Sequence, residues 1–276
     1  MKLPDSAAWH EALAQVPGTG SGGPLEVQVL TGGTANSTYR VQTGQGAFVV
    51  RLHEPYVVDL GVDRRREAQL HGAAAAAGLA SRILAADPQG RYLVTQFLAG
   101  APWEPVDFED EARLWALART LRALHALPAP RVAPLDLGVL LQRHVAQLAA
   151  QDAGAVQDLL PQVARAGEIL ARQGQAGRRA CIIHGDLTHS NVIGVPQPRL
   201  IDWEYAAVAD PLADLACLVA YYPQVMGHGA QLLRQCGLAD SASLPELEEL
   251  AGIYRLLSNL WYRRLALARR YPRPAN

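Results

Sequence analysis

The chain changes its hydrophobic periodicity once, and this change constrains the fold more than any other feature. In the first third, apolar runs at 25–30, 38–43 and 47–53 are rich in β-branched residues and separated by glycine-bearing segments, which predicts three antiparallel strands. From residue 111 onward the apolar residues recur at helical spacing, as at 114, 117, 118, 121 and 124. A chain of 276 residues divided in this way fits one large domain or two lobes around a cleft.

Glycine, proline and alanine subdivide the first third. The segment GTGSGGP at 18–24 is predicted to be flexible and separates a short N-terminal helix from the strands. A helix is predicted over 63–77, because the stretch opens with charge, continues in alanine and stops at Gly78. A hairpin around DPQG follows and leads into a connector at 96–103.

The helical remainder contains one interruption. A helical block is predicted over 138–173, and helices resume from 211 to the end. Between them, short strands are predicted at 181–184, 192–195 and 199–202. The last two form a β-hairpin that turns at VPQPR.

Composition excludes several classes of partner. With 25 basic and 26 acidic residues the formal net charge is -1, so nothing draws the whole chain to nucleic acid or anionic lipid. No apolar run has the length of a signal peptide or of a membrane-spanning helix. Cys181, Cys217 and Cys236 are widely spaced without a CxxC pair, which is typical of reduced core residues. We therefore expect a cytoplasmic protein without nucleic-acid or membrane partners, and leave its oligomeric state open.

The segment IIHGDLTHSNV at 182–192 holds the residues most suited to chemistry. The predicted hairpin places Asn191 at its entry beside Asp202 at its exit, and Asp186 faces them from the preceding loop. Asn191 and Asp202 suit a nucleotide-bound Mg²⁺, while Asp186 can accept a proton from a substrate hydroxyl. Turn formation explains Asp186 or Asn191 singly, but not the string HGDxxxxN followed by IDWE. His184 is expected to support the loop by hydrogen bonding.

HGDLTHSN together with LIDWEYAAVADPLADLA resembles the aminoglycoside phosphotransferase and choline kinase superfamily, whose fold is similar to that of protein kinases. The resemblance implies a bilobal α+β fold, with a nucleotide-binding lobe over 1–98 and a helical catalytic and substrate lobe over 99–276. It further implies ATP and Mg²⁺ as cofactors and a small-molecule alcohol as acceptor. Asp186 would be the catalytic base, Asn191 and Asp202 the metal ligands, and Asp214 a structural support.

Residues of the first third match the nucleotide-binding part of this superfamily. LTGGTANSTYRV occupies the place of the phosphate-covering loop, so Thr31, Gly32, Gly33 and Asn36 are expected to contact nucleotide. By themselves, the two glycines are better explained by a plain hairpin. The main-chain groups of the connector residues Gln96, Phe97 and Leu98 are expected to bind adenine.

Arg51 stands where protein kinases carry a lysine, in a chain whose only lysine is Lys2. Loss of that lysine is compatible with an inactive nucleotide-binding protein, but arginine keeps its charge, can fork onto phosphate oxygens, and occurs at this place in choline kinases. Glu67 is the candidate partner of Arg51. The alternative interpretation of Glu67 is a solvated helix residue beside Arg64.

The acceptor is predicted to be cationic, because DWEYA and Arg51 are similar to the choline, ethanolamine and thiamine kinases. A cation requires carboxylates or aromatic faces, and the candidates are Trp203, Glu204, Tyr205 and Trp261. For Trp261, ordinary helix core is an alternative. Two other functions stay open: an aminoglycoside or sugar phosphotransferase, which would need a wide acidic surface, and a nucleotide-binding pseudokinase scaffold.

Overall fold

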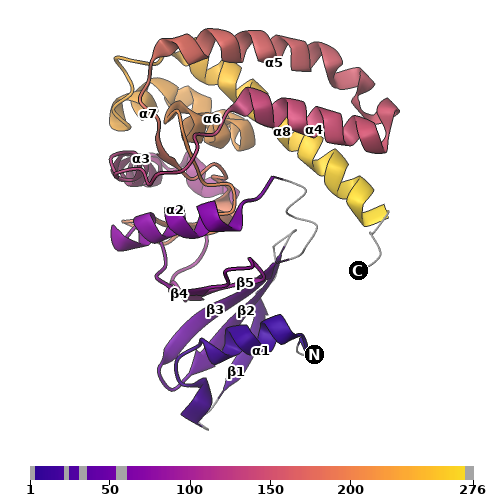
Figure 1. Ribbon diagram of the computed structural model, residues 1–276. Helices are drawn as coiled ribbons and strands as arrows, with labels where there is room; N and C mark the ends of the chain where they lie inside the picture. Colours follow the sequence, from indigo (N-terminus) through magenta and orange to yellow (C-terminus); the bar gives the residue numbers. More distant parts are fainter. Residues whose placement is uncertain (1–3, 22–24, 31–35, 54–60, 271–276) are drawn as a thin grey trace.

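A five-stranded antiparallel sheet and a group of helices occupy opposite ends of the computed structural model, which describes residues 4–21, 25–30, 36–53 and 61–270 (Figure 1). The sheet has the order β1-β2-β3-β5-β4. Its strands are β1 (Glu26–Leu30), β2 (Asn36–Thr43), β3 (Gly46–His53), β4 (Ile83–Ala86) and β5 (Tyr92–Gln96). This arrangement confirms the predicted bilobal α+β fold.

Helix α1 (Ala7–Ala14) covers one face of this sheet and packs on β3 and β5. The Ser6 side chain caps the helix by accepting a hydrogen bond from the Trp9 amide. Successive strand residues point to opposite faces, so Val41, Phe48 and Val50 turn inward and bury a small core with Trp9.

Helix α2 (Arg64–Ala76) lies between the sheet and the other helices (Figure 1). Asp63 caps it by accepting hydrogen bonds from two backbone amides. Its buried residues Leu70 and Ala74 belong to the core of the helical lobe. The Leu200 amide also donates to the Leu79 carbonyl at 2.9 Å, so α2 and the segment after it are attached to the helical lobe.

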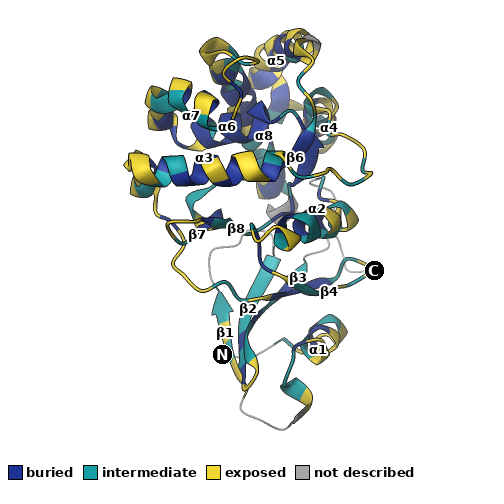
Figure 2. Ribbon diagram, turned by 90° about the vertical axis from the view of Figure 1, so that its left-hand side faces the viewer, coloured by how far each residue is buried: buried dark blue, intermediate teal, exposed yellow. Residues whose placement is uncertain are grey.

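The helical lobe is built from six helices among the described residues. These are α3 (Glu111–His125), α4 (Leu137–Gln151), α5 (Leu160–Gln173), α6 (Leu212–Tyr221), α7 (Gly229–Gln235) and α8 (Leu244–Arg270). Every residue of the predicted stripe on α3 is buried, and buried residues alternate with exposed ones along that helix (Figure 2). In this part of the chain, no helix is both long and apolar enough to cross a membrane.

The predicted helical block over 138–173 is divided into two α-helices. Helices α4 and α5 are separate and joined by a 3₁₀ segment, Ala153–Leu159. Asp152 ends α4 in extended backbone and its side chain accepts from the Gly154 amide. An aspartate that bonds its own following backbone competes with a continuing helix, which explains the break.

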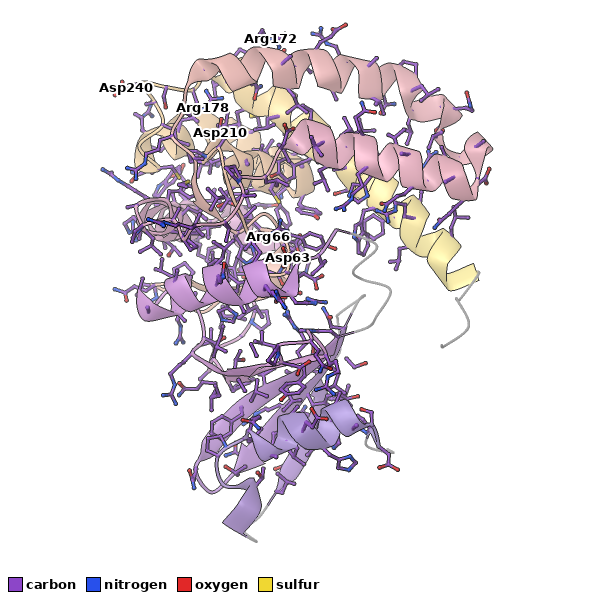
Figure 3. All side chains as sticks on the ribbon, in the orientation of Figure 1. Asp63, Arg66, Arg172, Arg178, Asp210 and Asp240 are labelled. Carbon is purple, nitrogen blue, oxygen red and sulfur yellow. The ribbon has the colours of Figure 1, made fainter. Side chains whose placement is uncertain are left out.

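Four short strands interrupt the helices: β6 (Cys181–Ile183), β7 (Val192–Ile193), β8 (Arg199–Leu200) and β9 (Ala207–Ala209). The hairpin β7–β8 is present but shorter than predicted. Strand β9, which pairs with β6, was not predicted, because Ala-Val-Ala carries little strand signal. An ion pair of 2.7 Å between Arg178 and Asp210 supports this pairing at its end (Figure 3). The three cysteines are free and buried, as predicted.

Candidate active site

A cleft of about 840 Å³ lies between the sheet and the helices. Its walls come from β3 and β5, from the connector after β5, from the segment 185–205 and from α8. Most predicted site residues line it: Asn36, Arg51, Gln96, Phe97, Leu98, Asp186, Asn191, Asp202, Trp203, Glu204, Tyr205 and Trp261. Thr31, Gly32 and Gly33 lie outside the described residues.

Residues 184–191, which we call the HGD loop, are attached to the core through His184. This side chain is fully buried, and burial lowers its pKa. Its Nε2–H donates to the Ile201 carbonyl at 2.9 Å, and its Nδ1 accepts from the Asp186 amide at 3.3 Å. His184 therefore supports the loop as a neutral residue.

Gly185 is required by the close approach of two backbone segments. Its φ is +79°, and a Cβ at this position would lie 2.6 Å from the Tyr205 carbonyl oxygen. The buried Asp214 carboxylate, on α6, accepts from the amides of Gly185 at 2.9 Å and His184 at 3.1 Å. His125 donates to the same carboxylate at 2.9 Å. These bonds hold the turn that presents Asp186 to the cleft.

The two oxygens of the Asp186 carboxylate have different donors. Asn191 Nδ2 donates to Oδ2 at 2.9 Å, and Tyr221 Oη donates to Oδ1 at 3.2 Å. Burial raises the pKa of Asp186 to about 7, the charges of Asp202 and Glu204 add to this rise, and both hydrogen bonds oppose it. A carboxylate with a pKa near neutrality is suited to accept a proton from a substrate hydroxyl.

Asp202 is placed in the cleft by the β7–β8 hairpin. The β7–β8 hairpin aligns Asn191 with Ile201, whose amide donates to the Asn191 carbonyl at 3.0 Å. Asp202 follows with a φ of +61°, the sole positive φ of a non-glycine residue within the ranges that the structure describes. Such backbone strain persists where surrounding structure imposes it, often at functional sites.

Asn191 and Asp202 fit a bound Mg²⁺ in the chemistry of their donors. Both supply oxygen atoms, which are the ligands this cation prefers. No group of three or more His, Cys, Asp or Glu able to hold a metal occurs in the described part of the chain. A cation held by Asn191 and Asp202 would take its remaining ligands from phosphates and water.

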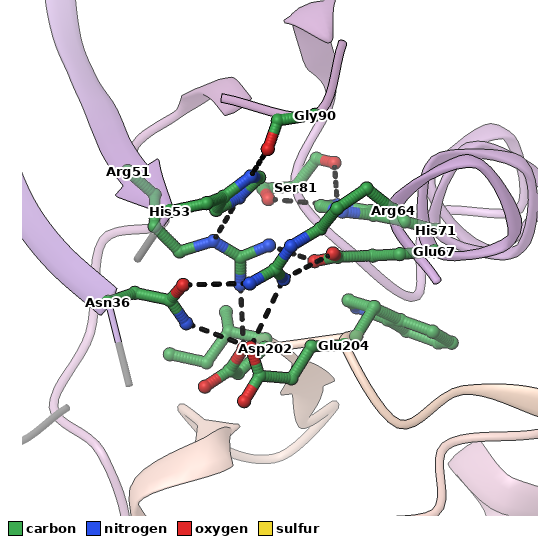
Figure 4. A network of polar contacts seen from close by, with 12 residues as sticks. Asn36, Arg51, His53, Arg64, Glu67, His71, Ser81, Gly90, Asp202 and Glu204 are labelled. Atoms are coloured by element: carbon green, nitrogen blue, oxygen red, sulfur yellow. Dashed lines mark hydrogen bonds and ion pairs between the residues drawn. The ribbon is translucent and has the colours of Figure 1, made fainter. Parts of the chain in front are cut away.

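A buried network of charges joins the two lobes (Figure 4). Arg51 pairs with Glu67, donates to Asp202 Oδ1 at 2.6 Å and donates to His53 at 3.2 Å. Arg64 Nη1 lies 2.8 Å from Glu67 Oε2. Because Glu67 is 2% exposed, the alternative of a solvated helix residue is excluded.

Asn36 and Glu204 also belong to this network. Glu204 Oε2 accepts from Asn36 Nδ2 at 2.8 Å and from Arg64 at 3.1 Å, and Arg64 donates to Asn36 Oδ1 at 2.9 Å. Burial raises the pKa of Glu204, while both arginines and Asn36 oppose this rise. Both residues also line the cleft, so the contacts of Asn36 with nucleotide and of Glu204 with substrate stay predictions.

Trp203, which was predicted to bind substrate, has its side chain in the core of the helical lobe. Its side chain is fully buried, its ring stacks on His71 with centroids 5.8 Å apart, and its edge meets His184 at 4.8 Å. Its Nε1–H donates to the Leu200 carbonyl at 3.1 Å. Asp202 and Glu204 instead reach Arg51 and Arg64, while Trp203 packs on His71 and His184.

The connector offers fewer groups to adenine than predicted. The Gln96 amide donates to the Arg82 carbonyl at 2.9 Å, and the Phe97 amide donates to the Ala47 carbonyl at 3.0 Å. Neither amide is free for a nucleotide. Within the described ranges, the Leu98 amide makes no such backbone bond. The groups left to bind adenine are therefore the Leu98 amide and the carbonyl groups of the connector.

The far wall of the cleft is aromatic. Tyr205, Tyr221, Tyr254 and Trp261 line it, together with Ser258. Trp261 is partly buried yet faces the cleft, so it is not simply helix core. Tyr221 and Ser258 were not identified from the sequence. The only signal for Tyr221 was its position seven residues after Asp214, on the same face of a helix.

The two lobes and the acidic groups between them define a kinase-like phosphotransferase. The chain belongs to the phosphotransferase enzyme family, whose family model matches residues 26–260. A mouse relative, acyl-CoA dehydrogenase family member 10, is 24% identical over 252 residues, which is 81% of this chain and 23% of that protein. The chain spans about a fifth of the length of the curated relatives it matches.

Two solved structures share the fold. Choline kinase LicA from Streptococcus pneumoniae has a TM-score of 0.73 at 18% identity, covering 98% of this chain and 94% of that chain. The ADP-bound aminoglycoside phosphotransferase APH(2'')-Ib has a TM-score of 0.62 at 16% identity, covering 96% of this chain and 99% of that chain. At these identities the likeness shows the fold, which hosts more than one acceptor class.

Proposed function

We propose that this phosphotransferase moves the γ-phosphoryl group of ATP, bound with Mg²⁺, to the hydroxyl group of a small cationic molecule. The convergence of Asp186, Asn191 and Asp202 on one interlobe cleft carries this proposal. The similar fold of an ADP-bound aminoglycoside phosphotransferase supports a nucleotide donor. Mg²⁺, when bound by Asn191 and Asp202, neutralises charge on the transferring phosphates.

The chain's own residues position the reactants. The acceptor hydroxyl donates to Asp186 and loses its proton to this carboxylate as its oxygen forms the new bond to the γ-phosphorus. The bond from phosphorus to the β,γ-bridging oxygen breaks, and ADP leaves. The Arg51 guanidinium can present two N–H groups to phosphate oxygens.

The aromatic wall supports a cationic acceptor. Tyr205, Tyr221, Tyr254 and Trp261 line the cleft on the side of Asp186 and α8. A ring face attracts a cation within about 6 Å of its centroid, by about 0.5–2 kcal/mol per contact. The choline kinase activity of a protein with this fold is consistent with such an acceptor.

The test is ADP release from Mg·ATP with choline, ethanolamine, thiamine, an amino sugar or homoserine as acceptor. We expect one cationic alcohol to raise ADP release above the rate without acceptor, and ³¹P NMR to detect its phosphate ester. The Asp186→Asn variant is the matched control and should lower this rise by about two powers of ten or more. Tight Mg·ATP binding without ADP release for any acceptor would instead indicate a pseudokinase scaffold.

A further inference from the structure

Helix α6 contacts the HGD loop through side chains on one of its faces. Asp214 accepts from the His184 amide, and Cys217 Sγ lies 3.4 Å from the Leu187 amide. Residues three and four apart share a helix face, so the same face continues to Tyr221. The helix therefore follows the loop backbone from its start and ends beside the Asp186 carboxylate.

Tyr221 is the last residue of α6, and its hydroxyl donates to Asp186 Oδ1 at 3.2 Å. Asn191 donates to the other oxygen, Oδ2, at 2.9 Å. Two donors from separate elements thus determine the plane of one carboxylate. Burial and the Asp186 charge raise the pKa of Tyr221, so its hydroxyl keeps its proton and remains a donor at neutral pH.

The next residue immobilises the backbone at this point. The ring of Tyr222 stacks on Phe108 with centroids 4.1 Å apart, and its hydroxyl accepts from the His189 amide at 2.6 Å. Tyr222 is buried, whereas Tyr221 is 38% exposed and lines the cleft. A side chain on a fixed backbone that reaches both the cleft and the carboxylate is well placed to act on the reaction.

We propose that Tyr221 is a positioning residue whose hydroxyl orients the Asp186 carboxylate to accept the proton of the acceptor. This inference rests on the proposed function, because it assigns Asp186 the role of base. Oδ1 has a second lone pair, to which the acceptor hydroxyl can donate beside Tyr221 Oη. The Tyr221 ring then forms the wall next to the bound acceptor.

Tyr221→Phe tests the hydroxyl alone, because the ring is retained. We expect turnover with choline, the first probe acceptor, to fall about tenfold, a part of the factor that a general base contributes. The KM for Mg·ATP and the midpoint of thermal unfolding should stay unchanged, since neither depends on this bond. Tyr39→Phe, on β2 against Trp9 and away from the cleft, is the matched control and should keep full turnover.

A double-mutant cycle shows whether Tyr221 affects turnover through Asp186 or independently of it. If Tyr221 acts through Asp186, Tyr221→Phe should change turnover by less than about twofold in the Asp186→Asn background. The same tenfold loss in both backgrounds would overturn the proposal, as would unchanged turnover in Tyr221→Phe alone.

A second measurement distinguishes failure of this inference from failure of the proposed function. With 3-fluorotyrosine at position 221, the ¹⁹F resonance should shift when Asp186 is replaced by asparagine, whether or not any acceptor is phosphorylated. Absence of turnover together with this shift refutes the proposed function and leaves the contact between the two residues established. A resonance that does not respond to Asp186→Asn overturns the role of Tyr221.

Discussion

Arg51 and Asp202 form an ion pair across the cleft, with Arg51 Nη1 2.6 Å from Asp202 Oδ1. Arg51 lies on β3 and Asp202 follows β8, so this pair joins the two lobes directly. The same guanidinium pairs with the buried Glu67. A cation bound at Asp202 would therefore share this carboxylate with Arg51 or displace Arg51, and its binding would be coupled to the contact between the lobes.

Asp202→Asn should weaken metal binding while keeping an oxygen at this position. We expect the Mg²⁺ concentration that gives half-maximal ADP release to rise by about tenfold or more, because a carboxylate binds a hard cation better than an amide. Calorimetric titration of Mn²⁺ into the chain with a nonhydrolysable ATP analogue measures the affinity directly. Asp240→Asn, at an exposed position, is the control. Equal metal affinity in both variants would remove Asp202 from the ligand set.

Asp186→Asn should lower turnover by about two powers of ten or more, because the amide cannot accept the proton. Affinity for the ATP analogue should change little, since Asn191, Asp202 and Arg51 are retained. Steady-state ADP release and analogue titration measure the two quantities separately. A variant with wild-type turnover would refute the assignment of the base.

Gly185→Ala should disrupt the HGD loop, because a Cβ would meet the Tyr205 carbonyl oxygen at 2.6 Å in backbone with a φ of +79°. We expect the free energy of unfolding to fall by about 2–5 kcal/mol from strain and overpacking combined. Gly177→Ala provides the matched control, because its φ is +65° with nothing within 4 Å of the added Cβ. In that variant the free energy of unfolding should fall by only about 1–2 kcal/mol, the cost of a left-handed backbone conformation. Equal losses would show that the close contact is unimportant.

Acid should destabilise the fold through buried histidines. Burial, with a smaller contribution from nearby arginines, lowers the pKa of His71 and of His144 to about 4. In the unfolded chain these rings bind protons near pH 6.5, so their neutral forms favour folding fully above that pH. As pH falls from about 6.5 to 4, each should reduce the free energy of unfolding by about 1.4 kcal/mol per pH unit.

Urea unfolding at a series of pH values measures this slope. His144→Gln should flatten it by the contribution of one histidine, because glutamine does not titrate. His10→Gln, which replaces an exposed ring, should leave the slope unchanged. A slope that is the same in all three proteins would exclude His144 as a source of the acid sensitivity.

Local signals predicted the elements whose pattern is complete within one segment. The apolar stripe on α3, the hairpin after Asn191 and the helix that begins near Asp63 all follow from spacing and capping over a few residues. Strand β9 and the break between α4 and α5 were missed. Ala-Val-Ala has little strand preference and its partner β6 is distant in the chain, so β9 depends on tertiary pairing. Around Asp152, the neighbouring alanines favour helix and conceal the break.

The fold class and the shared location of Asp186, Asn191 and Asp202 could be predicted from the sequence alone, because motif spacing and a hairpin bring those residues together through local chain geometry. The core position of Trp203, the pairing of Glu204 with Arg64 and the contact of Tyr221 with Asp186 are visible only in the folded chain. Each of these depends on contacts between segments distant in sequence. Whether a polar or aromatic side chain meets a ligand, a counter-charge or a packed interior is set by those contacts, which residue type and periodicity do not encode.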